Sequence, residues 1–171
     1  MKTILSFLKE EHDRVDAYFK AAVENDNIDR EKYDLFRKAL LRHIKQEEKV
    51  LFPAAKIANN GESVPLFAQL RAEHGALTAL MVPPPTEELL FVINYILELH
   101  DEKEKGRGGV YDFCDKLEAL ETNKIIKELE AVEEVPIHPC NTDPIAMEAA
   151  KRALQRAGYD YDEISSKMYK K

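Results

Sequence analysis

Apolar residues recur every three or four positions along most of this 171-residue chain, which is the period of an amphipathic α-helix. No comparable stretch alternates apolar and polar residues in the manner of a β-strand. Breaks in the helical pattern define four segments in the first part of the chain, at residues 3–23, 29–58, 63–81 and 86–104. We therefore predict an all-α fold.

Residues that end helices separate these segments. Asn59, Asn60 and Gly61 form a helix stop, and the prolines of VPPPT (82–86) must end the third segment because proline cannot continue a helix. Amphipathic helices joined by short connections favour an up-down-up-down four-helix bundle.

The chain changes character after the fourth segment. Gly106, Gly108 and Gly109 interrupt the pattern, which resumes over residues 110–121. An acidic helix is predicted at 123–134, and a further helix starts at Asp143-Pro144 and ends near residue 157. We expect residues 1–121 to form the bundle and residues 122–171 to form a C-terminal helical extension.

Charge and composition narrow the possible partners and the location. A formal net charge of -7 argues against binding to nucleic acid or to an anionic membrane. No apolar run approaches the length of a membrane span, and MKTILSFLKEEHD becomes charged too early for a signal peptide. We expect a cytoplasmic protein, in which Cys114 and Cys140 need not form a disulfide.

Four of the five histidines recur once per predicted helix, and each interrupts the apolar stripe of its helix. Two of them are followed four residues later by a glutamate, which places both side chains on one helix face. The six inward-facing residues are His12, His43, Glu47, His74, His100 and Glu104.

Two inward glutamates decide how these residues are interpreted. A single histidine on an apolar face is commonly a hydrogen-bonded core residue. A buried unpaired carboxylate, in contrast, costs several kcal/mol, and two of them would remove much of a typical stability of about 5–15 kcal/mol. No lysine or arginine lies on the same stripes. A pair of metal cations solves this problem because the carboxylates are then coordinated.

The donor types and their spacing narrow the metal. Imidazole and carboxylate ligands without thiolate fit iron, manganese or zinc, and disfavour Cu(I) and iron–sulfur clusters. Two carboxylates shared by two metals are typical of carboxylate di-iron bundles. Because 31 residues separate His12 from His43 and another 31 separate His43 from His74, the ligands should lie at similar heights in antiparallel helices.

Four segments of the sequence resemble the hemerythrin-like (HHE cation-binding) family. They are EEHDRVDAYF (10–19), LRHIKQEEKVLFP (41–53), LRAEHGALTAL (70–80) and ELHDEKE (98–104). The resemblance spans about residues 1–115 and implies a four-helix bundle around a non-haem di-iron centre, usually oxo- or hydroxo-bridged, in preference to zinc or manganese. By motif the ligands would be the same six residues, with Glu47 and Glu104 bridging the two irons.

Two departures from the family pattern affect this interpretation. Oxygen-carrying hemerythrins have a second histidine where this chain has Thr78. A set of four histidines and two glutamates is similar to that of iron–sulfur cluster repair proteins and leaves each iron with an open position. The second departure is KGRGG after Glu104, which leaves Asp101 or Glu102 as alternatives for the second bridge. Glu104 is preferred because it repeats the spacing of Glu47.

Three functions follow from the resemblance. The first is a di-iron protein that binds O2, NO or a related small ligand, as a sensor, scavenger or iron store. The second is a di-iron oxidoreductase or an iron donor for iron–sulfur cluster repair under nitrosative or oxidative stress. Such repair proteins usually carry an N-terminal cysteine-bearing domain, which we do not expect before His12. The third is a metal-stabilised helical interaction module.

Several other residues are candidates for a functional role. His138 beside Cys140 is expected to be an exposed loop residue, and Cys114 a buried small hydrophobe. Four acids flank the ligands, and their plain role is solvation, although any one of them would also suit accepting a hydrogen bond from a ligand imidazole: Glu10, Glu11, Glu48 and Glu73. Tyrosines at helical spacing are expected in the core or at an interface, although they would also suit a radical or proton path: Tyr18, Tyr95 and Tyr111.

Overall fold

The computed structural model describes residues 2–170, and no strand occurs in this range. The predicted all-α fold class is therefore confirmed. The chain forms two compact units, one made of Met1–Phe67 and Lys103–Ile137, the other of Ala68–Glu102 and His138–Lys171. Within residues 2–170 no helix combines the length and the apolar character needed to cross a membrane.

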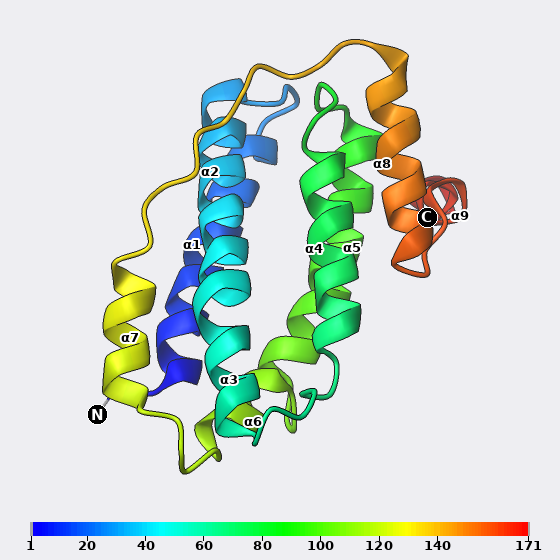
Figure 1. Ribbon diagram of the computed structural model, residues 1–171. Helices are drawn as coiled ribbons and strands as arrows, with labels where there is room; N and C mark the ends of the chain where they lie inside the picture. Colours follow the sequence, from blue (N-terminus) through cyan, green and yellow to red (C-terminus); the bar gives the residue numbers. More distant parts are fainter. Residues whose placement is uncertain (1, 171) are drawn as a thin grey trace. The chain divides into compact units, whose positions relative to one another are not determined.

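The first unit starts with helix α1 (Ile4–Val23), which runs antiparallel to the next long helix (Figure 1). Thr3 and Ser6 form a capping box, in which each side chain accepts a hydrogen bond from the other residue's backbone N–H. The predicted stripe faces inward, because all of its members are buried: Ile4, Leu8, His12, Val15 and Phe19.

The second predicted helix is continuous but not uniform. It consists of α2 (Arg30–Gln46), a π-helical turn η1 (Glu47–Leu51) and α3 (Phe52–Ala58). The backbone N–H of Phe52 donates to the carbonyl of Glu47, five residues earlier, which is the π-helical hydrogen bond. Such single-turn π segments occur frequently at functional sites. The predicted helix stop is confirmed, since Gly61 has φ of 78° and donates to the carbonyl of Lys56.

A sharp glycine turn leads from the end of α5 into α6 (Val110–Asp115). A β-carbon on Gly109 would lie 2.7 Å from the carbonyl oxygens of Lys103 and Glu104, and 2.8 Å from that of Gly106. Only glycine fits this close backbone approach. Asp115, at the end of α6, accepts hydrogen bonds from the backbone N–H groups at the start of α1.

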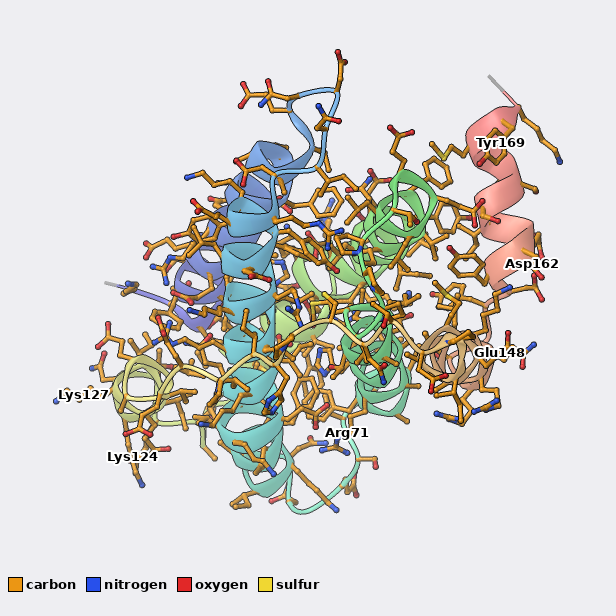
Figure 2. The ribbon with its side chains drawn as sticks, turned by 90° about the horizontal axis from the view of Figure 1, so that it is seen from above. Arg71, Lys124, Lys127, Glu148, Asp162 and Tyr169 are labelled. Carbon is orange, nitrogen blue, oxygen red and sulfur yellow. The ribbon has the colours of Figure 1, made fainter. Side chains whose placement is uncertain are left out.

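Helix α7 (Thr122–Glu130) completes the first unit and buries Ile125, Ile126 and Leu129. Figure 2 shows its lysines on the side that faces away from α2. Its end is held by α2, because Arg42 donates to the carbonyls of Glu130 and Val132, at 3.2 and 2.9 Å. The predicted end at residue 134 was wrong, and these long-range contacts to the chain after Glu130 are the physical reason.

The second unit contains α4 (Phe67–Leu80) from Ala68 onward and α5 (Glu87–Lys105) as far as Glu102, and these two helices run antiparallel (Figure 1). They are followed by α8 (Pro144–Arg156) and α9 (Tyr161–Ser166). Asp143 caps α8 as predicted, by accepting from the backbone N–H of Ile145.

The predicted start of the third helix at residue 63 was wrong. Leu66, which lies within the predicted range, is 43% exposed and has φ of 70°. Pro65 disfavours helical backbone at the residue before it, so residues 63–66 stay outside the helix and α4 starts at Phe67.

Gly109→Ala should lower the free energy of unfolding by about 1–3 kcal/mol, because three carbonyl oxygens occupy the space of the new methyl group. Urea unfolding followed by circular dichroism measures this loss. Gly75→Ala is the matched control: no atom lies within 4 Å of its β-carbon position, and alanine inside α4 should stabilise by about 0.5–1 kcal/mol. Equal effects of the two substitutions would contradict the close approach at Gly109.

Candidate metal centre

Four of the six predicted ligands converge in the first unit. They are His12 of α1, His43 of α2, Glu47 of the π-helical turn and Glu104 near the end of α5, and each offers one donor atom within 4.8 Å of the others. His12 Nε2 lies 3.1 Å from Glu104 Oε2, and His43 Nε2 lies 3.6 Å from Glu47 Oε2. All four side chains are buried, and both glutamates are 0% exposed.

This cluster fits a metal cation by its donor chemistry and its spacing. Metal bonds of about 2.0–2.2 Å to nitrogen and oxygen place neighbouring donors on one ion about 3 Å apart. The two measured separations are close to that value. Two carboxylates without solvent contact also need positive charge nearby, and a multivalent cation supplies it.

Tyr111 of α6 extends into the same cluster. Its hydroxyl oxygen lies 2.8 Å from His12 Nε2, 3.4 Å from His43 Nε2 and 3.0 Å from Glu104 Oε2, and it donates a hydrogen bond to Glu47 Oε1. Burial, and then the negative charges of Glu104 and Glu47, raise the pKa of the Tyr111 phenol well above its ordinary value. The phenol is therefore neutral when no cation is present.

The prediction that Tyr111 lies in the core is confirmed, since its side chain is 0% exposed. Its contact with the predicted ligands was not foreseen. The available signal is KGRGG (105–109), which ends two residues before Tyr111 and departs from a regular helix. The glycine turn starts α6 at Val110 and so brings the Tyr111 side chain to the cluster.

The remaining two histidines lie together in the second unit. His74 of α4 and His100 of α5 are both buried, and their ring centroids are 4.8 Å apart. His100 Nδ1 lies 2.8 Å from Oε2 of Glu73, a carboxylate with 0% exposure. A carboxylate on Nδ1 holds the proton there and leaves Nε2 as the lone-pair nitrogen, which is the usual arrangement behind a metal-binding imidazole.

The C-terminal extension also reaches Glu73. Tyr159, which follows α8, donates a hydrogen bond to Glu73 Oε1 at 2.7 Å, and Gln69 donates to the same oxygen at 2.9 Å. Gln69 also donates to the carbonyl of Ala157 at 2.9 Å, so one side chain links α4 to the end of α8. The expected hydrogen bond from an imidazole to a flanking acid is thus observed, and a residue of the extension supports it.

Burial separates the three acids considered for the second bridge. Glu104 is 0% exposed and belongs to the cluster, whereas Glu102 is exposed and Asp101 is half-buried. Thr78, which replaces the additional histidine of oxygen carriers, is exposed.

Cys114 and His138 lie where the sequence predicted. Cys114 is 1% exposed, and burial raises the pKa of its thiol to about 12, so it is protonated at neutral pH. His138 is exposed and Cys140 half-buried.

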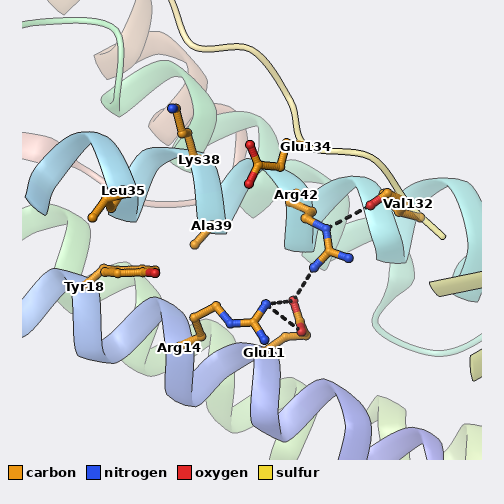
Figure 3. A pocket seen from close by; sticks show the side chains of 9 residues that line it. All are labelled: Glu11, Arg14, Tyr18, Leu35, Lys38, Ala39, Arg42, Val132 and Glu134. Carbon is orange, nitrogen blue, oxygen red and sulfur yellow. Dashed lines mark hydrogen bonds and ion pairs between the residues drawn. The ribbon is translucent and has the colours of Figure 1, made fainter. Parts of the chain in front are cut away.

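A surface pocket of the first unit carries charged side chains but no comparable donor cluster (Figure 3). Arg14 and Arg42 both pair with Glu11, at 3.1 and 3.0 Å. Lys38 and Glu134 line the same pocket, so cationic and anionic side chains are mixed there.

The helical fold and the buried histidine–glutamate cluster define a metal-binding helical protein. Residues 3–82 match the model of the family described as Hemerythrin HHE cation binding domain, so this stretch of the chain is similar to that family. The matched stretch contains His12, His43, Glu47 and His74. Comparisons with curated proteins and with solved structures gave no match.

Proposed function

We propose that the chain binds two non-haem iron ions through six side chains. The ligands in this proposal are His12, His43, Glu47, His74, His100 and Glu104, with the two glutamates bridging. The observation that carries it is the buried cluster of two imidazoles and two carboxylates in the first unit. The cation-binding family of residues 3–82 gives independent support.

The number and spacing of the donors favour two ions over one. Glu47 follows His43 by four residues, and Glu104 follows His100 by four, so each pair shares one helix face. Each pair thus joins a terminal imidazole to a carboxylate with two oxygens, which suits a bridge between metals. His12 and His74 then supply the second imidazole of each ion.

The function supported best is binding of a small ligand such as O2 or NO, as a sensor, scavenger or iron store. Two imidazoles and two shared carboxylates give each ion about four donors from this set, fewer than a six-coordinate ion requires. Iron supplies a redox-active binding position for such a ligand. The chain's own residues hold the iron, keep the centre buried and exclude larger molecules.

Residues 122–171 are assigned a supporting role within this proposal. The boundary between residues 1–121 and residues 122–171 remains a prediction, and so does the cytoplasmic location. The hydrogen bond from Tyr159 to Glu73 favours support of His100 over a role in docking another protein.

Purified protein should contain about two iron ions per chain, by analogy with other carboxylate di-iron bundles, and its visible spectrum should respond to azide and to NO. Elemental analysis and absorption spectroscopy measure both. Zinc, or less than one metal per chain, would contradict the di-iron proposal. Bound iron without any spectral response would instead favour a metal-stabilised interaction module.

Glu104→Gln should have opposite effects with and without metal. The iron-loaded variant should lose metal, together with about 2–4 kcal/mol of the stabilisation that tight binding provides. The metal-free variant should be at least as stable as the metal-free wild type, because a buried carboxylate has been neutralised.

Thermal unfolding of both forms, with metal analysis, measures the effects of Glu104→Gln. Glu102→Gln is the matched control on the same helix, and being exposed it should change neither quantity. Metal loss in the Glu102 variant alone would move the second bridge to that residue.

Tyr159→Phe should weaken metal binding about 10-fold. This is the lower end of the loss of affinity that follows when a side chain that supports a metal ligand by hydrogen bonding is removed. The phenyl ring keeps the packing, but Glu73 loses one of its hydrogen bonds. Competition with a chelator measures the affinity, and the melting temperature of the metal-free protein reports any structural damage. Tyr169→Phe, which removes a 3.3 Å hydrogen bond to the surface residue Glu88, should leave the affinity unchanged.

A further inference from the structure

We propose that Tyr111 is a seventh protein ligand, binding the ion held by His12 and His43 through its phenolate oxygen. This inference rests on the proposed metal centre and goes beyond it, because the six-residue set contains no tyrosine. It is carried by the position of the Tyr111 oxygen among four side chains that are themselves candidate ligands.

The distances are those of donors that share one ion. Ligands at right angles on a metal with bonds of about 2.0–2.2 Å lie about 3 Å apart. The Tyr111 oxygen is 2.8 Å from His12 Nε2, 3.4 Å from His43 Nε2 and 3.0 Å from Glu104 Oε2, and it contacts Glu47 Oε1. One oxygen therefore neighbours all four other donors.

Hydrogen bonding alone accounts poorly for this arrangement. A phenol has a single proton, so Tyr111 cannot donate to both Glu47 and Glu104 at the same time. With its proton given to Glu47, the Tyr111 oxygen lies 3.0 Å from Glu104 Oε2 without a phenol proton between the two oxygens, which repel unless positive charge lies near them. A cation bound to both oxygens removes that repulsion.

The fold holds Tyr111 rigidly in this position. Gly109 allows the tight turn into α6. Val110 and Cys114, which precede and follow Tyr111 on this helix, are buried as well. Asp115 ties the end of α6 to the backbone of Ile4 and Leu5. Because α1 also carries His12, the tyrosine and the histidine are positioned by one pair of connected helices.

Ligation by Tyr111 exchanges a proton for a metal bond and involves no change of oxidation state. The O–H bond breaks, the oxygen–metal bond forms, and the proton leaves to solvent. Phenolate adds one negative charge beside Glu47 and Glu104, which favours the ferric state. The ion near His12 and His43 then has five protein donors, so the open positions for a small ligand lie mainly on the ion held by His74 and His100.

Resonance Raman spectroscopy of the full chain loaded with Fe(III) tests this assignment. We expect a phenolate-to-iron charge-transfer band whose excitation enhances tyrosine ring and C–O vibrations. Tyr111→Phe should abolish the band while retaining most of the iron. Tyr18→Phe, at the surface pocket of Figure 3, should keep it. Iron-loaded wild type without tyrosine vibrations would overturn the assignment but leave the di-iron proposal standing.

Zinc loading separates failure of this inference from failure of the di-iron proposal. Added to metal-free protein, Zn²⁺ should release about one more proton per chain from wild type than from Tyr111→Phe, since a phenol carries a single proton. Such a difference in a protein that does not retain iron would sustain the tyrosine ligand and reject di-iron. Equal proton release from the two proteins would overturn the proposal that Tyr111 is a metal ligand. If the variant does not fold, the Raman spectrum of the wild type tests the same proposal by itself.

Discussion

Two carboxylates with no solvent exposure, those of Glu47 and Glu104, impose the strongest physical constraint on the first unit. A buried carboxylate is stable only with compensating charge and hydrogen bonds, and the surrounding residues supply nitrogen and oxygen atoms at metal-binding distances. Helices α1 and α2 each contribute a histidine to this environment, the π-helical turn begins at Glu47, and the glycine turn delivers Tyr111. The irregular features of the unit thus occur where the charges are buried.

The parts of this arrangement that depend on local periodicity could be predicted from the sequence. The apolar stripe of a helix faces the core. The inward position of His12, His43 and the two glutamates therefore followed from their spacing along this stripe. Helix ends were predicted well where the stop is a local signal, as at Gly61. They were predicted poorly where it is not. The end of α7 lies where Arg42, 90 residues away from Val132, binds the chain.

Contacts that depend on the direction of the chain after a turn could not be predicted. Periodicity placed Tyr111 in the core, but its contact with His12 spans 99 residues and depends on the close backbone approach at Gly109. The contact of Tyr159 with Glu73 spans 86 residues and likewise follows from how α8 packs beside α4. A tyrosine on an apolar stripe has the same pattern whether its hydroxyl reaches a ligand or another polar group.

The four histidines also differ in what supports them, which bears on how a two-ion centre would behave. His12 contacts a phenol that is flanked by carboxylates, whereas His100 is backed by Glu73, itself hydrogen-bonded to Gln69 and Tyr159. A carboxylate behind an imidazole makes that ligand more basic, and a phenolate adds charge directly. The two ions would therefore have unequal ligand sets, with the more saturated one fixed in place by the turn at Gly109. If the proposed di-iron centre forms, the hydrogen bonds of Tyr159 and Gln69 to Glu73 would act on the ion held by His100.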